Sequence, residues 1–454
     1  MAGIVTGAQG DGGTRALPTS TTIGGYTMTE ALAPYTKSVL PNGIRLLTAS
    51  MPATRAVSIA FYVGTGSRFE HEAESGASHF LEHILFKGTE RRPLAQDVSE
   101  TIERVGGFMN ASTDREVTVY WARVARPHLS IGIDILSDML LNSTFPAEEI
   151  EKERDVILEE IHTSVDSPAQ QVFHMADKIM WPDQPLGRDI AGTEESVREI
   201  SRDTIMSYMR EQYDPSQVVM AVAGQIEHAE IEQVVGELLE SWPSGNPRPM
   251  PPVDDKQPES RVALEYRKTE QANICLMFPG MSAHDSDRRA LWLLNSILGD
   301  GMACRLFLEL RERLGIVYEV DTDVMYLQDT GAMAVFVGTV PQRGPQALEA
   351  VVKELERATR DITQSELDRA LELSKGRMLL RLEDTRSISS WLGGQEITFG
   401  HIETPEEVVE QLDSITVDDV QRVARRVFDP DRYRLTVVGP YRSDRKFRNI
   451  IEGR

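Results

Sequence analysis

The chain has 454 residues, of which 41% are hydrophobic and 26% charged, and a chain of this length is expected to fold into two or more packed domains. Its formal net charge of -23 and its lack of any basic tract argue against binding to nucleic acid or to an anionic membrane surface. Two explanations of the charge stay open: an acidic interior that attracts basic peptides, or an acidic surface that keeps the protein soluble.

The N-terminus and the cysteines carry few signs of a special compartment. Residues 1–35 are rich in Gly, Thr and Ala and lack the apolar core of a secretory signal, so we predict a flexible leader. Cys275 and Cys304 form no CxxC pair, which argues against a disulfide framework or a cysteine-based zinc site. There is no run of about 18 apolar residues that would predict a membrane span. A cytoplasmic location is the default expectation.

The first half of the chain holds short strand patterns and longer helical patterns. Apolar residues alternate or run together at 43–50, 57–64 and 118–124, which predicts strands. Amphipathic spacing predicts helices at 147–163 and 229–241. The sequence PSGNPRPMPPVDDKQP follows Trp242, and neither a helix nor a central strand continues through so much Pro and Gly. We therefore predict a first domain at 36–242 and a linker at 243–258.

The second half repeats the pattern of the first. Strands are predicted at 262–267, 274–280 and 332–338, and a helix at 345–359. Two strand patterns end at Gly64 and Gly280, which are 216 residues apart. The tripeptides Tyr-Asp-Pro (213–215) and Phe-Asp-Pro (428–430) each precede an apolar run, and they are 215 residues apart. The near-equal offsets indicate a tandem duplication, with the second domain at 259–454.

The grouping of these elements predicts the fold class. Runs of strands alternate with grouped helices rather than with single helices, which is typical of α+β proteins. We expect two homologous domains, each a mostly antiparallel sheet covered by helices.

The strongest chemical signal is the segment His79-Phe80-Leu81-Glu82-His83. Ser78 is a plausible N-cap, and on a helix His79 and His83 lie one turn apart on the same face. That spacing suits two ligands of a tetrahedral zinc ion, and Glu82 can reach a water at the metal as general base. About 0.03 matches to such a pattern are expected by chance in a chain of this composition and length, so ordinary roles for two helical histidines are the weaker explanation.

A zinc site that is open to water needs a third protein ligand. The predicted helix after Pro146 carries Glu153 and Glu160, seven residues apart and therefore on one face. One could bind the metal while the other supports a ligand or a substrate group. By itself an acidic helix is more often a solvated surface.

Three segments together resemble the pitrilysin and insulin-degrading enzyme family, whose inverted HxxEH zinc motif defines the inverzincins. They are GSRFEHEAESGASHFLEHILFKGT (66–89), GGFMNASTDREVTVY (106–120) and ERDVILEEI (153–161). The resemblance spans about residues 36–445 and is greatest to the mitochondrial and bacterial processing peptidases. Glu160 follows His83 by 77 residues, the spacing of the glutamate ligand in that family.

The resemblance implies a role for each site residue. Zn²⁺ is expected on His79, His83 and Glu160, with Glu82 as general base and Glu153 as an acidic residue that assists the site. A further match, Asn110-Ala111, implies a strand whose edge pairs with an extended substrate. The segment RLFLELRERLGIVY (305–318) matches the place where an Arg and a Tyr reach the substrate, here Arg311 and Tyr318.

The resemblance also implies an assembly and a reaction. Family members of this length form half of a clamshell, in which two chains enclose an acidic chamber that admits unfolded peptides. Because this chain carries both the zinc motif and the Arg311/Tyr318 pair, a homodimer is favoured over a heterodimer. The expected activity is that of a zinc endopeptidase on unfolded peptides, with basic peptides favoured by an acidic wall. The alternatives are a non-catalytic assembly or partner subunit, and an enzyme that degrades oligopeptides generally rather than processing precursors.

Overall fold

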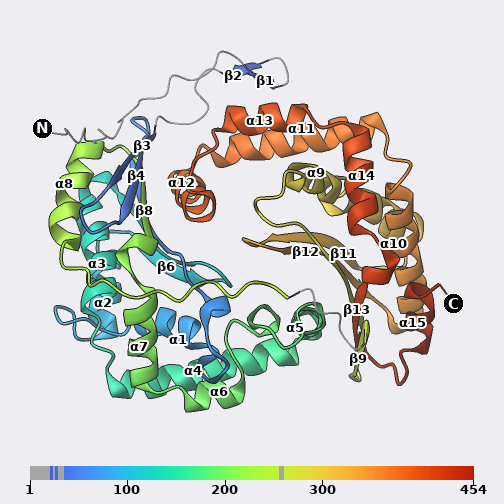
Figure 1. The fold of residues 1–454 in the computed structure, drawn as a ribbon, viewed down its shortest axis with the longest axis horizontal. Coiled ribbons are helices and arrows are strands. Elements are labelled where there is room, and N and C mark those ends of the chain that lie inside the picture. The colour runs from blue at the N-terminus through green and yellow to red at the C-terminus, as the bar shows by residue number, and fades with distance from the viewer. Residues whose placement is uncertain (1–20, 24–25, 29–34, 255–259, 454) are drawn as a thin grey trace, which may run out of the picture.

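The computed structural model describes residues 21–23, 26–28, 35–254 and 260–453. It shows two α+β domains whose sheets face one another across the molecule, with helices on the outside (Figure 1). Most of the predicted leader and the end of the predicted linker, 255–258, lie outside the described residues. Within the leader, β1 (Thr21–Ile23) pairs with β2 (Tyr26–Met28). None of the described helices is both long enough and apolar enough to cross a membrane.

The first domain is built on a six-stranded sheet in the order β3-β4-β8-β5-β7-β6. Neighbouring strands are antiparallel except β4 and β8. The strands are β3 (Tyr35–Val39), β4 (Arg45–Ser50), β5 (Ala56–Val63), β6 (Phe108–Thr113), β7 (Thr118–Ala125) and β8 (Val218–Gly224). The helices are α1 (Ala77–Ile84), α2 (Ala95–Glu103), α3 (Leu129–Asn142), α4 (Ala147–Asp166), α5 (Pro168–Met180), α6 (Glu194–Glu199), α7 (Arg202–Gln212) and α8 (His228–Leu239).

The second domain has a five-stranded sheet in the order β11-β12-β10-β13-β9, in which only β13 and β9 are parallel. Its strands are β9 (Val262–Tyr266), β10 (Ala272–Pro279), β11 (Glu319–Tyr326), β12 (Gly331–Thr339) and β13 (Arg434–Gly439). A π-helix spans Phe307–Arg313. The α-helices are α9 (Arg288–Gly299), α10 (Gly344–Ala358), α11 (Gln364–Arg381), α12 (Thr385–Phe399), α13 (Pro405–Asp413), α14 (Val417–Val427) and α15 (Arg445–Ile451).

The two sheets repeat one strand order, which confirms the prediction of two homologous α+β domains with mostly antiparallel sheets. Reading across each sheet, β4-β8-β5-β7-β6 in the first corresponds to β9-β13-β10-β12-β11 in the second. The predicted helices at 147–163, 229–241 and 345–359 appear as α4, α8 and α10. In the region equivalent to α1, the second domain carries α9 with the sequence RRALWLLNSILG, which has no histidine.

Each domain lends one helix to the sheet of the other (Figure 1). Helix α5 follows α4 in the first domain but packs on β10 and β13, where the hydroxyl of Thr436 donates to the carbonyl of Val172 at 2.7 Å. Helix α12 of the second domain packs on β5 and β8, with the hydroxyls of Ser58 and Thr385 2.9 Å apart. The exchange places a helix from the other half of the chain on the central strands of each sheet.

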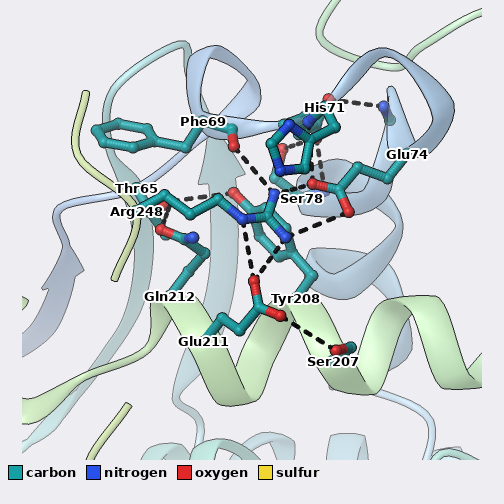
Figure 2. A network of polar contacts seen from close by, with 12 residues as sticks. Thr65, Phe69, His71, Glu74, Ser78, Ser207, Tyr208, Glu211, Gln212 and Arg248 are labelled. Carbon is teal, nitrogen blue, oxygen red and sulfur yellow. Dashed lines mark hydrogen bonds and ion pairs between the residues drawn. The ribbon is translucent and has the colours of Figure 1, made fainter. Parts of the chain in front are cut away.

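The described part of the linker is bound to the first domain by Arg248 (Figure 2). The Arg248 guanidinium binds the carboxylate of Glu74, and it donates to Glu211 on α7 at 2.6 Å. It also reaches the carbonyl of Phe69 at 3.3 Å. Because Phe69 and Glu74 belong to the segment that leads into α1, the linker fixes the approach to the zinc-motif helix.

Candidate metallopeptidase active site

Helix α1, which carries the HxxEH motif, begins two residues earlier than expected. Its N-cap is Gly76 with φ 95°, and a Cβ there would lie 2.5 Å from the carbonyl oxygen of Ala191, so glycine is required on two counts. The assignment of Ser78 as the N-cap is therefore wrong. The buried carboxylate of Glu70 instead accepts the backbone N–H groups of Gly76 and Ser78, both at 2.8 Å, and the Ser78 hydroxyl at 2.5 Å.

The histidines of the motif and Glu160 converge as predicted. Phe80, Leu81 and Ile84 are fully buried and fix α1 against the core, which leaves the other face of the helix to the histidines. The Nε2 atoms of His79 and His83 lie 3.8 and 3.6 Å from Oε2 of Glu160 on α4. These three residues form a metal-binding group in the described part of the chain.

The donor set fits zinc. Tetrahedral bonds of about 2.0–2.1 Å place ligand atoms about 3.4 Å apart, close to the spacing of the histidine nitrogens from Glu160. Nδ1 of His83 lies 3.1 Å from Glu153, the arrangement in which a carboxylate orients a metal-binding imidazole. Nδ1 of His79 is buried and has no hydrogen-bond partner among the described residues. His79, His83 and Glu160 could therefore hold Zn²⁺.

Glu153 is a supporting residue rather than a ligand in this geometry. Only 7% of its side chain is exposed, and its second oxygen binds the ammonium of Lys87 at 2.6 Å. Burial alone would raise the pKa of Glu153, but the hydrogen bonds with His83 and Lys87 outweigh it and lower the pKa. Its carboxylate is thus ionised and available to accept the proton on Nδ1 of His83.

The two histidines differ in charge preference. Burial, with a smaller effect of His83, lowers the pKa of His79 to about 4, so its imidazole is neutral near neutral pH and offers a lone pair. Burial also acts against protonation of His83, but the neighbouring carboxylates outweigh it and raise its pKa. A divalent cation would neutralise those carboxylates in place of the proton.

Glu82 lies in the same pocket as His79 and Glu160, with a geometry that suits a proton acceptor. Its Oε2 accepts a 2.6 Å hydrogen bond from the hydroxyl of Thr113 at the end of β6. Burial raises its pKa, although the Thr113 hydrogen bond acts in the opposite direction. A carboxylate with a raised pKa is a better base than a free one. With His79 and Glu160, it lines a pocket of about 370 Å³.

The same pocket has a wall that sequence reasoning missed. Ser164 on α4 and Asp189, in the loop before α6, both line it. His174 on α5 joins them, since its Nε2 lies 2.7 Å from the Ser164 hydroxyl and its Nδ1 contacts the Asp189 carboxylate. The available signal was that Ser164 follows Glu160 by one helical turn. His174 and Asp189 carry no such signal because each comes from a different element.

Asn110 and Ala111 lie on β6, an edge strand whose outer side has no strand partner in the described part of the chain. Ser112 and Thr113, which follow them, line the zinc pocket, so the free edge of β6 runs up to the site. Arg311 lies in the π-helix, and its guanidinium donates to the Tyr318 carbonyl at 2.5 Å. Tyr318 is 55% exposed. The two residues contact each other and are not among those that line the zinc pocket.

The profile of the insulinase family (Peptidase family M16) matches residues 45–194, and that of the Peptidase M16 inactive domain matches residues 199–373. An uncharacterized zinc protease of Streptomyces coelicolor is 36% identical over 411 residues, which are 89% of each chain. One of Bacillus subtilis is 35% identical, covering 88% of this chain and 97% of the relative. This chain belongs to the insulinase family.

Solved structures agree on the fold of this insulinase-family chain. A protease from Helicobacter pylori has a TM-score of 0.85 at 21% identity and covers 90% of this chain and 100% of its own. A Peptidase M16 inactive domain from Pseudomonas fluorescens has a TM-score of 0.83 at 18% identity, covering 90% and 98%. The relatives named zinc proteases agree with the zinc-type donor set described above.

Proposed function

We propose that this insulinase-family chain is a zinc endopeptidase that hydrolyses unfolded peptides. The observation that carries the proposal is the convergence of His79, His83 and Glu160 beside Glu82 in one pocket. A zinc ion bound there supplies a Lewis acid that polarises a carbonyl group and acidifies water. The chain retains every residue that the resemblance to processing peptidases requires at the metal and base positions.

The residues of the chain divide the work of hydrolysis. The free edge of β6 pairs with the extended peptide through Asn110 and Ala111. Glu82 takes the proton of the attacking water on its carboxylate and then delivers it to the nitrogen of the leaving amine. Thr113 orients the Glu82 carboxylate through their hydrogen bond. Arg311 holds the substrate backbone, and the hydroxyl of Tyr318 donates to the oxygen that becomes negative.

Basic peptides are the favoured substrates of this proposal. Ser164 and Glu160 line not only the zinc pocket but also a neighbouring depression on α4 that contains Asp155 and Glu159. Both of these acids are exposed on α4, and the chain as a whole carries a net charge of -23. An acidic path that leads to the site attracts cationic peptides and raises their rate of encounter.

The test is hydrolysis of quenched basic peptides by purified protein, with and without a chelator, after zinc is restored, and with Glu82→Gln. We expect loss with chelator, recovery with zinc, and a loss of about 100-fold or more in kcat for Glu82→Gln without loss of bound zinc. The exposed neighbour Glu159→Gln serves as a control for the metal content. Absence of turnover in every condition despite bound zinc would contradict the proposal and favour a non-catalytic partner subunit.

The proposed assembly is a homodimer that encloses the site in a chamber. Supporting it, one chain carries both the metal group and the Arg311/Tyr318 pair, so it needs no second gene product. Sedimentation of the purified protein should give twice the mass of one chain. A monomer that hydrolyses peptides would refute the proposed dimer and leave the proposed peptidase activity in place. Mapping cleavage sites on a mixed peptide pool distinguishes a processing enzyme, which cuts at few sites, from a general degrader.

A further inference from the structure

A hydrogen-bonded chain of three side chains ends in the zinc pocket and has no part in the proposed hydrolysis. Asp189 binds Nδ1 of His174, and Nε2 of His174 lies 2.7 Å from the hydroxyl of Ser164. At one end of this series, Asp189 is held in place, since its second carboxylate oxygen accepts a hydrogen bond from the backbone N–H of Ala191 at 2.9 Å. At the other end, Ser164 lines the pocket together with Glu82 and Glu160.

The chemistry of the three groups determines which way the hydrogen bonds run. An ionised carboxylate only accepts, so Nδ1 of His174 carries the proton and donates it to Asp189. When the ring is neutral, Nε2 is an acceptor, and the Ser164 hydroxyl donates to it. This hydrogen bond uses the hydroxyl proton of Ser164, and its oxygen lone pairs remain available as acceptors. Because Ser164 lines the pocket, its oxygen can accept a hydrogen bond from a ligand bound there.

An extended peptide in this pocket needs such an acceptor. A strand points its N–H and C=O groups alternately to its two sides, so a peptide paired with β6 satisfies only half of them. The other half faces away from β6, and a buried N–H without a partner is costly. Ser164 comes from α4, a different wall of the pocket from Ser112 and Thr113 of β6.

We propose that Ser164 accepts a hydrogen bond from a backbone N–H of the bound peptide next to the scissile bond, and that His174 and Asp189 are positioning residues that hold its hydroxyl in that orientation. This inference rests on the proposed peptidase function. It adds a peptide contact on the helical wall of the pocket to the pairing with β6. The alternative is that the three residues only tie α4, α5 and the loop at Asp189 together.

The binding experiment uses zinc-loaded full-length Glu82→Gln protein, so that peptides bind without being cleaved. The hydrogen bond to Asp189 raises the pKa of His174, so the measurements are made at alkaline pH, which favours the neutral imidazole. Ser164→Ala should weaken the affinity for a basic peptide about five-fold. Ser164→Thr, which keeps the hydroxyl, should restore it. Ser414→Ala, an exposed serine that donates to the Gln411 carbonyl, is the matched control and should change nothing.

Methylating one peptide nitrogen at a time identifies the partner of Ser164. One N-methyl peptide should bind more weakly than its parent to the protein that keeps Ser164. The same methylation should cost nothing further in the Ser164→Ala variant, since contacting groups are non-additive in a double-mutant cycle. His174→Ala should weaken binding like Ser164→Ala, and the double variant should weaken it no further. In the active enzyme, KM should rise while kcat stays within about two-fold.

The outcomes separate the inference from the proposed function. If peptides bind and are cleaved but Ser164→Ala binds as well as its parent, the Ser164 contact is refuted and the peptidase stands. If Ser164→Ala loses zinc or melts at a lower temperature with unchanged affinity, the three residues are a structural tie. If the zinc-loaded parent neither binds nor cleaves any peptide, the proposed function fails and the contact fails with it.

Discussion

Glu153 and Glu160 share one face of α4, yet their surroundings give them different roles. Glu160 is 48% exposed and lies beside both histidine Nε2 atoms, whereas Glu153 is buried against His83 and Lys87. Their seven-residue spacing predicted that one would bind metal and the other would support it. The sequence could not say which was which without the family spacing, because burial on a helix depends on what packs against each turn.

Glu153→Gln should weaken zinc binding about 10- to 100-fold, because an amide is a poorer acceptor for the proton on Nδ1 of His83. The pKa of Glu153 is lowered by the hydrogen bonds with His83 and Lys87, which outweigh its burial, so the wild-type group is charged where the variant is neutral. Competition with a fluorescent chelator measures the affinity. Glu159→Gln removes the same charge one residue from Glu160 and is the control. An equal loss of zinc affinity in that variant would mean that the effect comes from the net charge near the site and not from the hydrogen bond to His83.

Glu70 predicts a pH effect on stability. Burial raises its pKa to about 7 from an ordinary 4.5, although its hydrogen bonds with Ser78 and Gly76 act in the opposite direction. The folded state therefore binds more protons than the unfolded state between these values. The stabilisation from this group is fully present below about pH 4.5 and is lost as the pH rises through about 7.

Urea unfolding at several pH values from 5 to 8 checks this expectation. The stability of wild type relative to Glu70→Gln should fall by on the order of 1 to 3 kcal/mol across that range. Glu72→Gln, an exposed neighbour in the same segment, reports pH effects common to all variants. A difference between wild type and Glu70→Gln that is the same at both ends of the range would show that Glu70 does not titrate there.

At the scale of elements, periodicity predicted the long helices and the central strands well. The helices α4, α8 and α10 and the strands β4, β5, β7, β9, β10 and β12 lie where apolar spacing placed them. The segment at Phe307–Arg313 is a π-helix, and its seven residues are too few for apolar spacing to distinguish its period from that of an α-helix. The start of α1 was misjudged because its capping carboxylate, Glu70, lies outside the helix and reaches it through tertiary structure.

Two adjacent glycines in α12 test how closely this helix packs on the first sheet. A Cβ at Gly393 would lie 2.1 Å from the ring of Tyr62, whereas one at Gly394 would meet nothing within 4 Å. Replacing Gly by Ala inside a helix gains about 0.5–1 kcal/mol of helix propensity, but overpacking a core costs about 1–3 kcal/mol. Gly393→Ala should therefore destabilise the protein and Gly394→Ala should stabilise it.

Thermal and urea unfolding of the two variants measure the difference, and each variant is the control for the other because the chemical change is identical. Equal and favourable effects would mean that α12 moves away from Tyr62 without cost. In that case the contact between the helix and the sheet would be looser than the structure shows.

At the scale of the whole molecule, the sequence predicted the duplication but not the exchange of α5 and α12. Equal offsets between similar segments reveal that two halves share a fold. A helical apolar face reveals that the helix is covered, but not by which sheet, so α5 would be placed on its own domain by default. The contact of Thr436 with Val172 across 264 residues has no counterpart in local pattern.

Arg68 joins the two domains at a point that no sequence pattern marks. Its side chain is 1% exposed, and its guanidinium makes two 2.7 Å hydrogen bonds to the carboxylate of Asp329 in the β11–β12 turn. It also donates to Glu116 at 2.6 Å and to the Pro251 carbonyl at 2.7 Å. One buried cation thus holds a turn of the second domain and the linker against the segment that leads into α1.

Arg68→Met should destabilise the protein by on the order of 3 kcal/mol, because removing one partner of a buried ion pair leaves the other desolvated and unpaired. Asp329 is 28% exposed, and that access to water keeps the expected loss at the lower end. Arg422→Met is the control, since Arg422 is 50% exposed in its ion pair with Asp287 and should change stability by less than about 1 kcal/mol. Calorimetry also shows whether Arg68 couples the unfolding of the two domains. If it does, the variant should unfold in two separated transitions where the wild type unfolds in one. A single unshifted transition would mean that the exchanged helices alone hold the two domains together.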